Sequence, residues 1–255
     1  MVDLHCHLLP GLDDGPRTLE EAIALCRAAA DDGTLTLVAT PHVNGDYPQV
    51  TAAAITEAVA AVNRALRAAA LEVNVRTGAE VALSRVGELS DLELNRLCLG
   101  GGRYVLLELP WTSAAPGTLA ALRAFASRGY GIVLAHPERS PILQRDDALV
   151  ADLVRSGMLC CLDAGSLGDR AARATRATAW RLLAAGLVHA IASDCHDAVR
   201  RPPRLVSALD RAGLSASQID YFTREAPEAI LAGQAVAPAP PVEPRHRARW
   251  LPWRG

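Results

Sequence analysis

The chain has 255 residues, of which 50% are hydrophobic and 21% are charged, and its formal net charge is −2. This composition is typical of a globular protein with one large domain, and the charge balance provides no basic field for binding nucleic acid. All 26 basic residues are arginine, which excludes a lysine-containing phosphate loop of the G-x-x-x-x-G-K-[ST] type.

Short apolar runs rich in β-branched residues alternate along the chain with longer stretches of helical period. The short runs predict strands at 2–5, 35–40, 71–77, 104–109, 131–136, 158–163 and 188–193. Helices are expected at 18–32, 48–70, 116–128, 146–156, 170–185 and 203–212. Strands that alternate with helices pair in parallel. Seven such repeats without a Rossmann glycine fingerprint favour a closed or nearly closed α/β barrel over an open sheet.

The composition changes near Ala235. The last residues, 235–255, are rich in Pro and Arg and include Trp250 and Trp253. Such a segment buries too little apolar surface to offset the entropy lost on ordering. We therefore predict one domain at 1–234 and a disordered tail at 235–255.

The sequence also bears on the compartment. No basic and apolar leader follows Met1, and no apolar run reaches the roughly 18 residues that a membrane span needs. Six cysteines without a C-x-x-C pair indicate reduced thiols rather than a disulfide framework in a chain of this length. We therefore expect a cytoplasmic protein without a transmembrane segment.

A metal-competent side chain stands at the end of nearly every predicted strand. These residues are His5, His7, His42, Glu80, Glu108, His136, Asp194 and His196. The carboxyl ends of barrel strands converge on one face, where active sites are built. Five of the seven histidines, together with at least three carboxylates, are thus expected at one mouth.

Two motifs have a spacing that favours a metal site. In the H-x-H motif at 5–7 and the D-x-H motif at 194–196, the outer side chains share one face of a strand, because side chains alternate with a period of two. The same alternation directs Cys6 and Cys195 away from the metals and into the core. Mixed imidazole and carboxylate ligands suit Mn, Fe or Zn, and bridging carboxylates would allow two or three ions.

The loop Gly11-Leu12-Asp13-Asp14-Gly15 leaves one assignment open. Acidic residues beside glycines commonly form turns, but these two follow the H-x-H motif directly. One of them is therefore a candidate ninth ligand, and we favour Asp14 over Asp13.

The ordered motifs together indicate a family. They are Asp3-Leu4-His5-Cys6-His7, Thr40-Pro41-His42, Gly78-Ala79-Glu80-Val81, His136-Pro137-Glu138-Arg139 and Ser193-Asp194-Cys195-His196. This set resembles the PHP (polymerase and histidinol phosphatase) superfamily, and within it the manganese-dependent tyrosine-protein phosphatases of bacterial capsule and exopolysaccharide loci. The resemblance covers residues 1–233. Asp163, Ser140 and Ala226 depart from residues common in that family, which bears on substrate preference rather than on the metal site.

The resemblance implies a distorted (β/α)7 barrel of the PHP type with a trinuclear site, most simply of Mn. It divides the ligands among three ions: His5, His7, Asp194 and Glu80 for the first; Glu80, Glu108 and His136 for the second; and His42, His196 and Asp14 for the third. Arg139 and Arg201 occupy the positions of the family's phosphate-contacting arginines. A guanidinium fork matches phosphate oxygens well.

The activity implied by the resemblance is metal-dependent hydrolysis of a phosphomonoester. The substrate would be phosphotyrosine on a membrane-associated bacterial tyrosine kinase of a capsule or exopolysaccharide system. The alternatives are a small-molecule phosphatase such as histidinol phosphatase, a nucleic-acid phosphodiesterase, and a non-catalytic metal-binding regulator. The near-neutral charge argues against nucleic acid.

Cys195 and Arg201 also match the C-x-x-x-x-x-R spacing of cysteine-dependent tyrosine phosphatases. No glycine lies between them, whereas a loop that wraps phosphate with its backbone N–H groups usually needs that freedom. We therefore interpret the match as coincidence.

Overall fold

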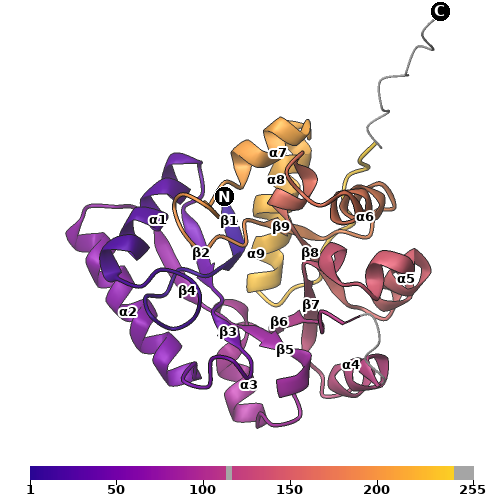
Figure 1. Ribbon diagram of the computed structural model, residues 1–255, viewed down its shortest axis with the longest axis horizontal. Coiled ribbons are helices and arrows are strands. Elements are labelled where there is room, and N and C mark those ends of the chain that lie inside the picture. The colour runs from indigo at the N-terminus through magenta and orange to yellow at the C-terminus, as the bar shows by residue number, and fades with distance from the viewer. Residues whose placement is uncertain (113–116, 244–255) are drawn as a thin grey trace, which may run out of the picture.

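The computed structural model describes residues 1–112 and 117–243 and shows an α/β architecture (Figure 1). The strands are β1 Val2–Cys6, β2 Thr36–Ala39, β3 His42–Val43, β4 Asn74–Thr77, β5 Glu80–Ala82, β6 Tyr104–Glu108, β7 Gly131–Ala135, β8 Leu159–Asp163 and β9 Ala190–Ala192. The helices are α1 Leu19–Asp31, α2 Ala52–Ala68, α3 Asp91–Leu97, α4 Thr118–Ala126, α5 Asp147–Arg155, α6 Arg173–Ala184, α7 Val206–Ala212, α8 Ala216–Asp220 and α9 Ala226–Leu231.

The strands form two sheets in which every pair is parallel. One sheet has the order β1-β2-β4 and the other the order β3-β5-β6-β7-β8-β9. The segment that follows β9 meets the end of β1, where an isolated bridge pairs Cys6 with Cys195. At this bridge the His7 N–H donates to the Cys195 carbonyl at 2.8 Å, and the Asp194 N–H donates to the His5 carbonyl at 3.0 Å. The expected parallel α/β fold is therefore confirmed.

Two of the predicted strands continue from one sheet into the other. Thr40 and Pro41 separate β2 from β3, and Gly78 and Ala79 separate β4 from β5 at the equivalent place. Pro41 has no N–H for a sheet ladder, and a Cβ on Gly78 would lie 2.7 Å from the Val38 side chain. Beyond these breaks His42 pairs with Glu80. The short strands β3 and β5, which the sequence did not predict, thus place two expected ligands side by side.

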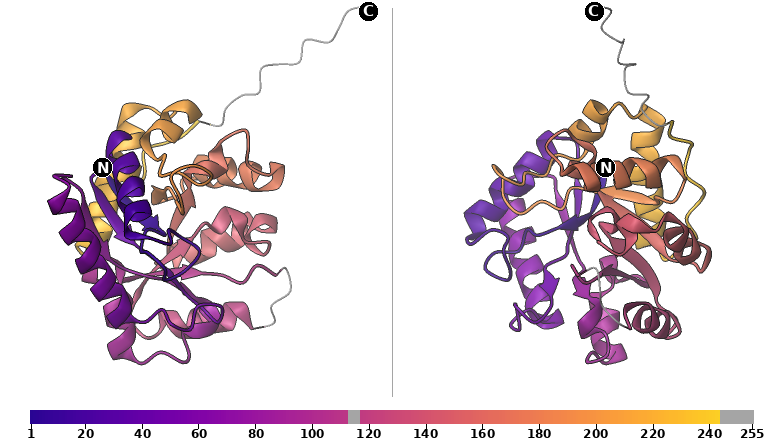
Figure 2. Two further views of the ribbon diagram at one scale, coloured as in Figure 1. Left: turned by 60° about the vertical axis from the view of Figure 1, so that its left-hand side comes forward. Right: turned by 45° about the vertical axis from the view of Figure 1, so that its right-hand side comes forward.

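Helices surround the sheets (Figures 1 and 2), and apolar side chains pack on both faces of the strands. Strand β6 illustrates the alternation: Val105 and Leu107 belong to the large cluster shared with the helices, whereas Leu106 belongs to a second cluster. Ile230 of α9 also lies in that second cluster. The C-terminal helix thus packs close to the N-terminal strand, as the views in Figure 2 show.

An irregularity in β1 sets the direction of the first two histidines. The register of β1 against β2 shifts between Asp3 and Cys6. Leu4 packs in the second cluster, whereas Cys6 packs in the helix-facing cluster. A regular strand would keep Leu4 and Cys6 on the same face. The shift therefore accounts for both His5 and His7 pointing toward the centre, with Cys6 turned away.

Several helices differ from the sequence prediction. The capping box of Thr18 and Glu21 starts α1 as expected. The helices α3, α8 and α9 were not predicted, although Ser90 and Glu93 form a capping box at the start of α3. These helices are 7, 5 and 6 residues long, too short to show a clear helical period.

The predicted tail begins against the domain. The Tyr221 hydroxyl donates to the Ala237 carbonyl at 2.5 Å, and the Gln218 side-chain amide donates to the Pro241 carbonyl at 2.7 Å. Val242 is buried. The expectation of disorder from Ala235 is therefore wrong for residues 235–243, because carbonyls in this segment find donors on the domain. Residues 244–255 of the predicted tail lie outside the described residues. Within the described part of the chain, no helix is long and apolar enough to cross a membrane.

Candidate metal centre

All nine predicted ligands lie near the carboxyl ends of the strands. His5 lies in β1, and His7 and Asp14 follow it. His42, Glu80 and Glu108 lie in β3, β5 and β6, respectively. His136 follows β7, and Asp194 and His196 follow β9. Seven of the nine form three overlapping groups, and within each group the ligand atoms lie within 4.8 Å of one another. The groups are His5, His7 and Glu80; His42, Glu80 and Glu108; and His7, Asp14, His42 and His196.

The first group surrounds one point between β1 and β5. Nε2 of His5 and Nε2 of His7 are 3.1 Å apart, and they lie 3.3 and 3.4 Å from Oε2 of Glu80. Oδ1 of Asp194 is 3.5 Å from His5 Nε2 and 3.6 Å from His7 Nε2. Four side chains therefore converge as the sequence predicted for the first ion.

Glu80 occupies the centre of the cluster and is almost completely buried. Besides the first group, its Oε2 lies 2.9 Å from Nδ1 of His42, while its Oε1 lies 2.8 Å from Nε2 of His136. The carboxylate thus has a different set of neighbours on each oxygen. This arrangement suits a carboxylate that bridges two ions.

Glu108 contacts a tryptophan that also contacts His136. It joins Glu80 and His42 in the group within 4.8 Å, whereas His136 reaches the other oxygen of Glu80. Oε1 of Glu108 accepts a hydrogen bond from the indole N–H of Trp111 at 2.9 Å. The Trp111 ring in turn stacks on His136, with ring centroids 5.5 Å apart. Trp111 therefore orients two expected ligands.

The structure separates the roles of Asp13 and Asp14. Oδ1 of Asp14 lies 3.3 Å from His196 Nε2 and 3.7 Å from His42 Nε2, and Asp14 belongs to the third group. Asp13 instead lies behind His7, with Oδ2 2.6 Å from His7 Nδ1 and 3.1 Å from the His42 N–H. A carboxylate on Nδ1 fixes the tautomer and leaves Nε2 available to a metal. Asp14 thus lies within the third group, whereas Asp13 orients His7 from behind.

The donor atoms at the centre fit divalent cations. Among the described residues, Nδ1 of His42 and Oε2 of Glu80 are buried without a hydrogen-bond partner. They are 2.9 Å apart, but their geometry does not make a hydrogen bond. His5 and His7 likewise face each other through ring nitrogens, and only one of the two can donate. Buried polar atoms rarely remain unsatisfied, and a cation between them would satisfy all four.

Interactions within the cluster lower the pKa of Asp14 and Glu80 and raise the pKa of several imidazoles. Burial lowers the pKa of His136, but the charge of Glu80 and its hydrogen bond raise it overall to about 9. Burial raises the pKa of Glu80, but the charges of His5 and His136 bring it well below its usual range. The hydrogen bond to His196 lowers the pKa of Asp14 to about 2. Metal binding would release the imidazole protons, because ligands bind in their deprotonated form.

Two of the ligand positions have an unusual backbone. His136 has a φ of 30° and Asp194 a φ of 49°. A positive φ is costly for residues other than glycine and is found disproportionately at functional sites. Both residues directly follow or nearly follow a strand. The left-handed conformation turns each side chain out of the strand path and into the cluster.

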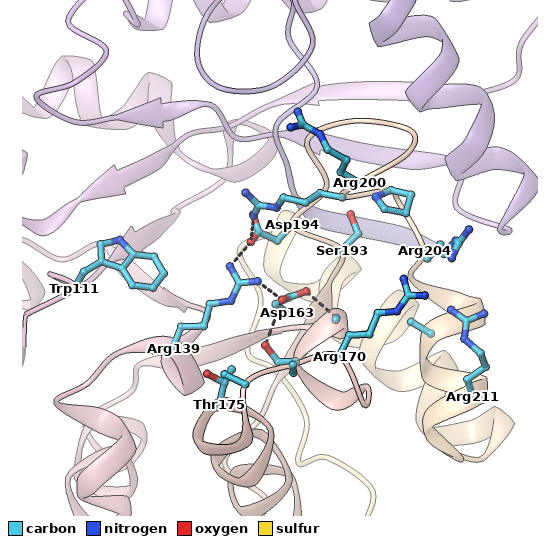
Figure 3. A pocket seen from close by; sticks show the side chains of 17 residues that line it. Trp111, Arg139, Asp163, Arg170, Thr175, Ser193, Asp194, Arg200, Arg204 and Arg211 are labelled. Atoms are coloured by element: carbon cyan, nitrogen blue, oxygen red, sulfur yellow. Dashed lines mark hydrogen bonds and ion pairs between the residues drawn. The ribbon is translucent and has the colours of Figure 1, made fainter.

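The two predicted arginines meet at the edge of the cluster. Nη1 of Arg139 donates to Oδ2 of Asp194 at 2.8 Å, and Nη2 of Arg201 donates to the same oxygen at 2.6 Å. Arg139 also pairs with Asp163 (Figure 3). Asp194 therefore presents Oδ1 to the histidines and Oδ2 to the arginines. Both guanidinium groups keep further N–H donors for an anion.

The structure excludes a nucleophilic role for Cys195. Cys6 and Cys195 are fully buried in the helix-facing core, which confirms the prediction that both are core residues. A thiol without solvent access cannot reach a substrate phosphate. The C-x-x-x-x-x-R match is therefore without chemical meaning.

Three residues with contacts at the site were not among the site residues predicted from the sequence. Asp163 ends β8 and pairs with Arg139; its place at a strand end was a usable signal. Trp111 follows Glu108 by three residues and offered no motif. Glu138 is fully buried, accepts the Asp163 N–H at 3.0 Å, and has its pKa raised by burial to about 7.

Known proteins resemble this chain over most of its length. The family described as capsular polysaccharide synthesis, CpsB/CapC, matches residues 1–231. Tyrosine-protein phosphatase YwqE of Bacillus subtilis is 30% identical over 248 residues, which cover 97% of this chain and 98% of that protein. Tyrosine-protein phosphatase CpsB of Streptococcus pneumoniae is 27% identical over 217 residues, or 82% of this chain and 88% of that protein.

Solved structures show the same relationship. A crystal structure from work on YwqE of Bacillus subtilis and CpsB of Streptococcus pneumoniae, described as unique metal-dependent tyrosine phosphatases, matches with a TM-score of 0.82. Its sequence identity is 29%, and the match covers 97% of this chain and 100% of that chain. A beta-aspartyl dipeptidase of Fervidobacterium islandicum, with 11% identity and a TM-score of 0.54, shares the fold alone. The family resemblance predicted from the motifs is confirmed: this chain belongs to the CpsB/CapC family of capsular polysaccharide synthesis.

Proposed function

We propose that this protein is a metal-dependent protein-tyrosine phosphatase. The observation that carries the proposal is the convergence of nine imidazole and carboxylate side chains, bordered by two arginines. Seven of the nine form three overlapping groups, and the other two, His136 and Asp194, lie beside Glu80 and His5. Relatives that cover nearly the whole chain are tyrosine-protein phosphatases by name. The proposed substrate is phosphotyrosine on a membrane-associated bacterial tyrosine kinase of a capsule or exopolysaccharide system, and the proposed compartment is the cytoplasm.

The proposal extends to the barrel and to the metals. We infer a distorted (β/α)7 barrel, in which β2 with β3 and β4 with β5 each count as one interrupted strand. The Cys6–Cys195 bridge between the two sheets supports this closure. We also infer two to three ions, with Mn preferred and Fe or Zn possible at such ligands. The ligands proposed for them are His5, His7, Asp14, His42, Glu80, Glu108, His136, Asp194 and His196.

The proposed chemistry is hydrolysis of the phosphoester by water. Divalent ions at such a site supply positive charge for the phosphate oxygens and lower the pKa of water. Arg139 and Arg201 would bind the phosphate oxygens and stabilise their charge as the bond to phosphorus forms. Asp194 holds both guanidinium groups in place through Oδ2. A phenolate leaves readily, so the chain needs no dedicated general acid.

The test compares substrate classes on Mn²⁺-loaded protein. The kcat/KM for a phosphotyrosine peptide is expected to exceed that for histidinol phosphate and for a phosphodiester by a wide margin. The reverse order would assign the protein to a small-molecule phosphatase. No turnover of any ester by protein with full metal content would instead indicate a regulator that binds metal without catalysis.

A further inference from the structure

A second cavity adjoins the candidate metal centre. It has a volume of about 560 Å³, and the cavity that contains the ligands has a volume of about 350 Å³. The two share four lining residues: Trp111, Arg139, Asp194 and Arg201. A molecule bound at the metal centre can therefore extend into the larger cavity without crossing a wall of the protein.

The larger cavity is strongly basic in a chain whose net charge is −2. Six arginines line it, namely Arg139, Arg170, Arg200, Arg201, Arg204 and Arg211. Asp163 and Asp194 are its only acidic lining residues within the described part of the chain, and both are already bonded to Arg139 or Arg201. The outer arginines, Arg170, Arg204 and Arg211, therefore add to the positive charge of the cavity.

These outer arginines lie on one side of the cavity. Figure 3 shows Arg170, Arg204 and Arg211 together on the side away from Trp111, with Arg139 and Asp194 between them and Trp111. Among the residues that the structure describes, the guanidinium groups of Arg170 and Arg204 have no ion-pair partner. Both side chains are exposed to the cavity. Arg170 and Arg204 therefore repel each other, and an anion bound between them would relieve this repulsion.

The start of α6 adds to this charge. Ala172 precedes the 12-residue helix without a capping side chain, and no acidic residue lies in the first turn. Ala172 and Thr175 also line the cavity. The free N–H groups of a helix start favour an anion, which reinforces the effect of the arginines.

We propose that the part of the cavity lined by Arg170, Arg204 and Arg211, the outer arginine pocket, binds a second anionic group of the substrate. That group is a carboxylate or a second phosphate on a residue near the phosphotyrosine. The proposal rests on the proposed tyrosine phosphatase function and deepens it. Phosphate at Arg139 and Arg201 would leave the neighbouring residues of the peptide facing the outer arginine pocket. Guanidinium groups bind both kinds of anion through paired hydrogen bonds.

The test uses three fluorescent peptides that share one phosphonomethyl-phenylalanine, a non-hydrolysable analogue of phosphotyrosine. Their flanking residues are neutral in the first, glutamate in the second, and a second phosphonomethyl-phenylalanine in the third. Their affinities are measured by fluorescence anisotropy with the Mn²⁺-loaded protein. We expect either acidic flank to tighten binding about tenfold over the neutral flank, as for partly exposed charge-assisted hydrogen bonds. The second and third peptides show which anion the pocket prefers.

A double variant and its matched control locate the effect. In R170Q/R204Q the ratio of affinities for acidic and neutral peptides should fall to about 1, because both unpaired charges are lost. The control R64Q/R67Q removes two exposed arginines of α2, which do not line the cavity, and should keep the tenfold ratio. Equal binding of all peptides by the unaltered protein, or an unchanged ratio in R170Q/R204Q, would overturn the proposal.

The readout also separates this proposal from the proposed function. Because the peptides cannot be hydrolysed, anisotropy reports on the outer arginine pocket independently of turnover. Turnover of p-nitrophenyl phosphate by the same Mn²⁺-loaded sample reports on the metal centre. Charge-dependent binding without turnover would refute the phosphatase and keep the pocket, whereas turnover without charge-dependent binding would do the opposite.

Discussion

Replacing Asp13 by Asn tests whether the residue behind a ligand controls the metal. The side chain of Asp13 is fully buried and accepts three hydrogen bonds, from His7 Nδ1, from the His42 N–H and from the Gly15 N–H. An amide of the same shape has one oxygen and one NH₂ group. In either orientation its NH₂ group would face at least one of these donors. Asp13→Asn therefore misdirects His7 or leaves a buried backbone N–H unsatisfied.

The size of the effect follows from these contacts. Carboxylates that orient a metal-bound histidine contribute about 10- to 100-fold to metal affinity, which corresponds to about 1.4 to 2.7 kcal/mol. The 2.6 Å distance between His7 Nδ1 and Asp13 Oδ2 is short and the pair is buried, which favours the upper half of this range. The buried unsatisfied donor should also lower the free energy of unfolding by about 1–3 kcal/mol.

The assay is a titration of chelator-stripped protein with Mn²⁺, in which free Mn²⁺ is read by its EPR signal and activity is measured on the same samples. Asp13→Asn should need roughly 30-fold more Mn²⁺ for half-occupancy and should recover much of its activity at saturation. Asp31→Asn at the exposed end of α1 removes the same charge elsewhere and serves as the control. An Asp13→Asn protein with unchanged Mn²⁺ affinity would refute the reasoning.

Further outcomes are expected at three other places. A chelator should abolish phosphatase activity, and Mn²⁺ should restore it better than Mg²⁺, because imidazole ligands suit Mg²⁺ poorly; full activity of metal-stripped protein would contradict the metal centre. Cys195→Ser should keep kcat/KM within about tenfold, whereas His196→Ala should lose about a hundredfold or more; an inactive Cys195→Ser protein with full metal content would restore the thiol mechanism. Burial lowers the pKa of His189 to about 4, and its Nδ1 accepts the Cys160 N–H at 3.1 Å. Its contribution to stability is therefore present above pH of about 6.5 and should be lost, by up to about 3 kcal/mol, as the pH falls toward 4. Urea unfolding of metal-free protein at pH 7.5 and 4.5 should show a smaller pH difference for His189→Gln, and an equal difference in both proteins would contradict this assignment.

The ligand positions could be predicted because they depend on local geometry. Side chains in a strand alternate, and parallel strands joined by helices present their carboxyl ends at the same edge. The H-x-H motif, the D-x-H motif and single residues such as Glu80 therefore reveal their common location without any knowledge of packing. The alternation also correctly assigned Cys195 to the core.

What the tertiary structure decided depends on contacts between residues far apart in sequence. The sequence could not choose firmly between Asp13 and Asp14, because the choice depends on where His7 and His196 lie around the loop. The sequence also could not predict that Glu108 lies near His42. The breaks at Pro41 and Gly78 move β3 and β5 into the second sheet, which also contains β6 and its Glu108. The larger cavity beside the metal centre likewise brings Arg139 together with residues that follow β8 and β9. Local periodicity specifies which end of a strand carries a side chain, but distances of a few ångströms are set by how all the strands and helices pack at once.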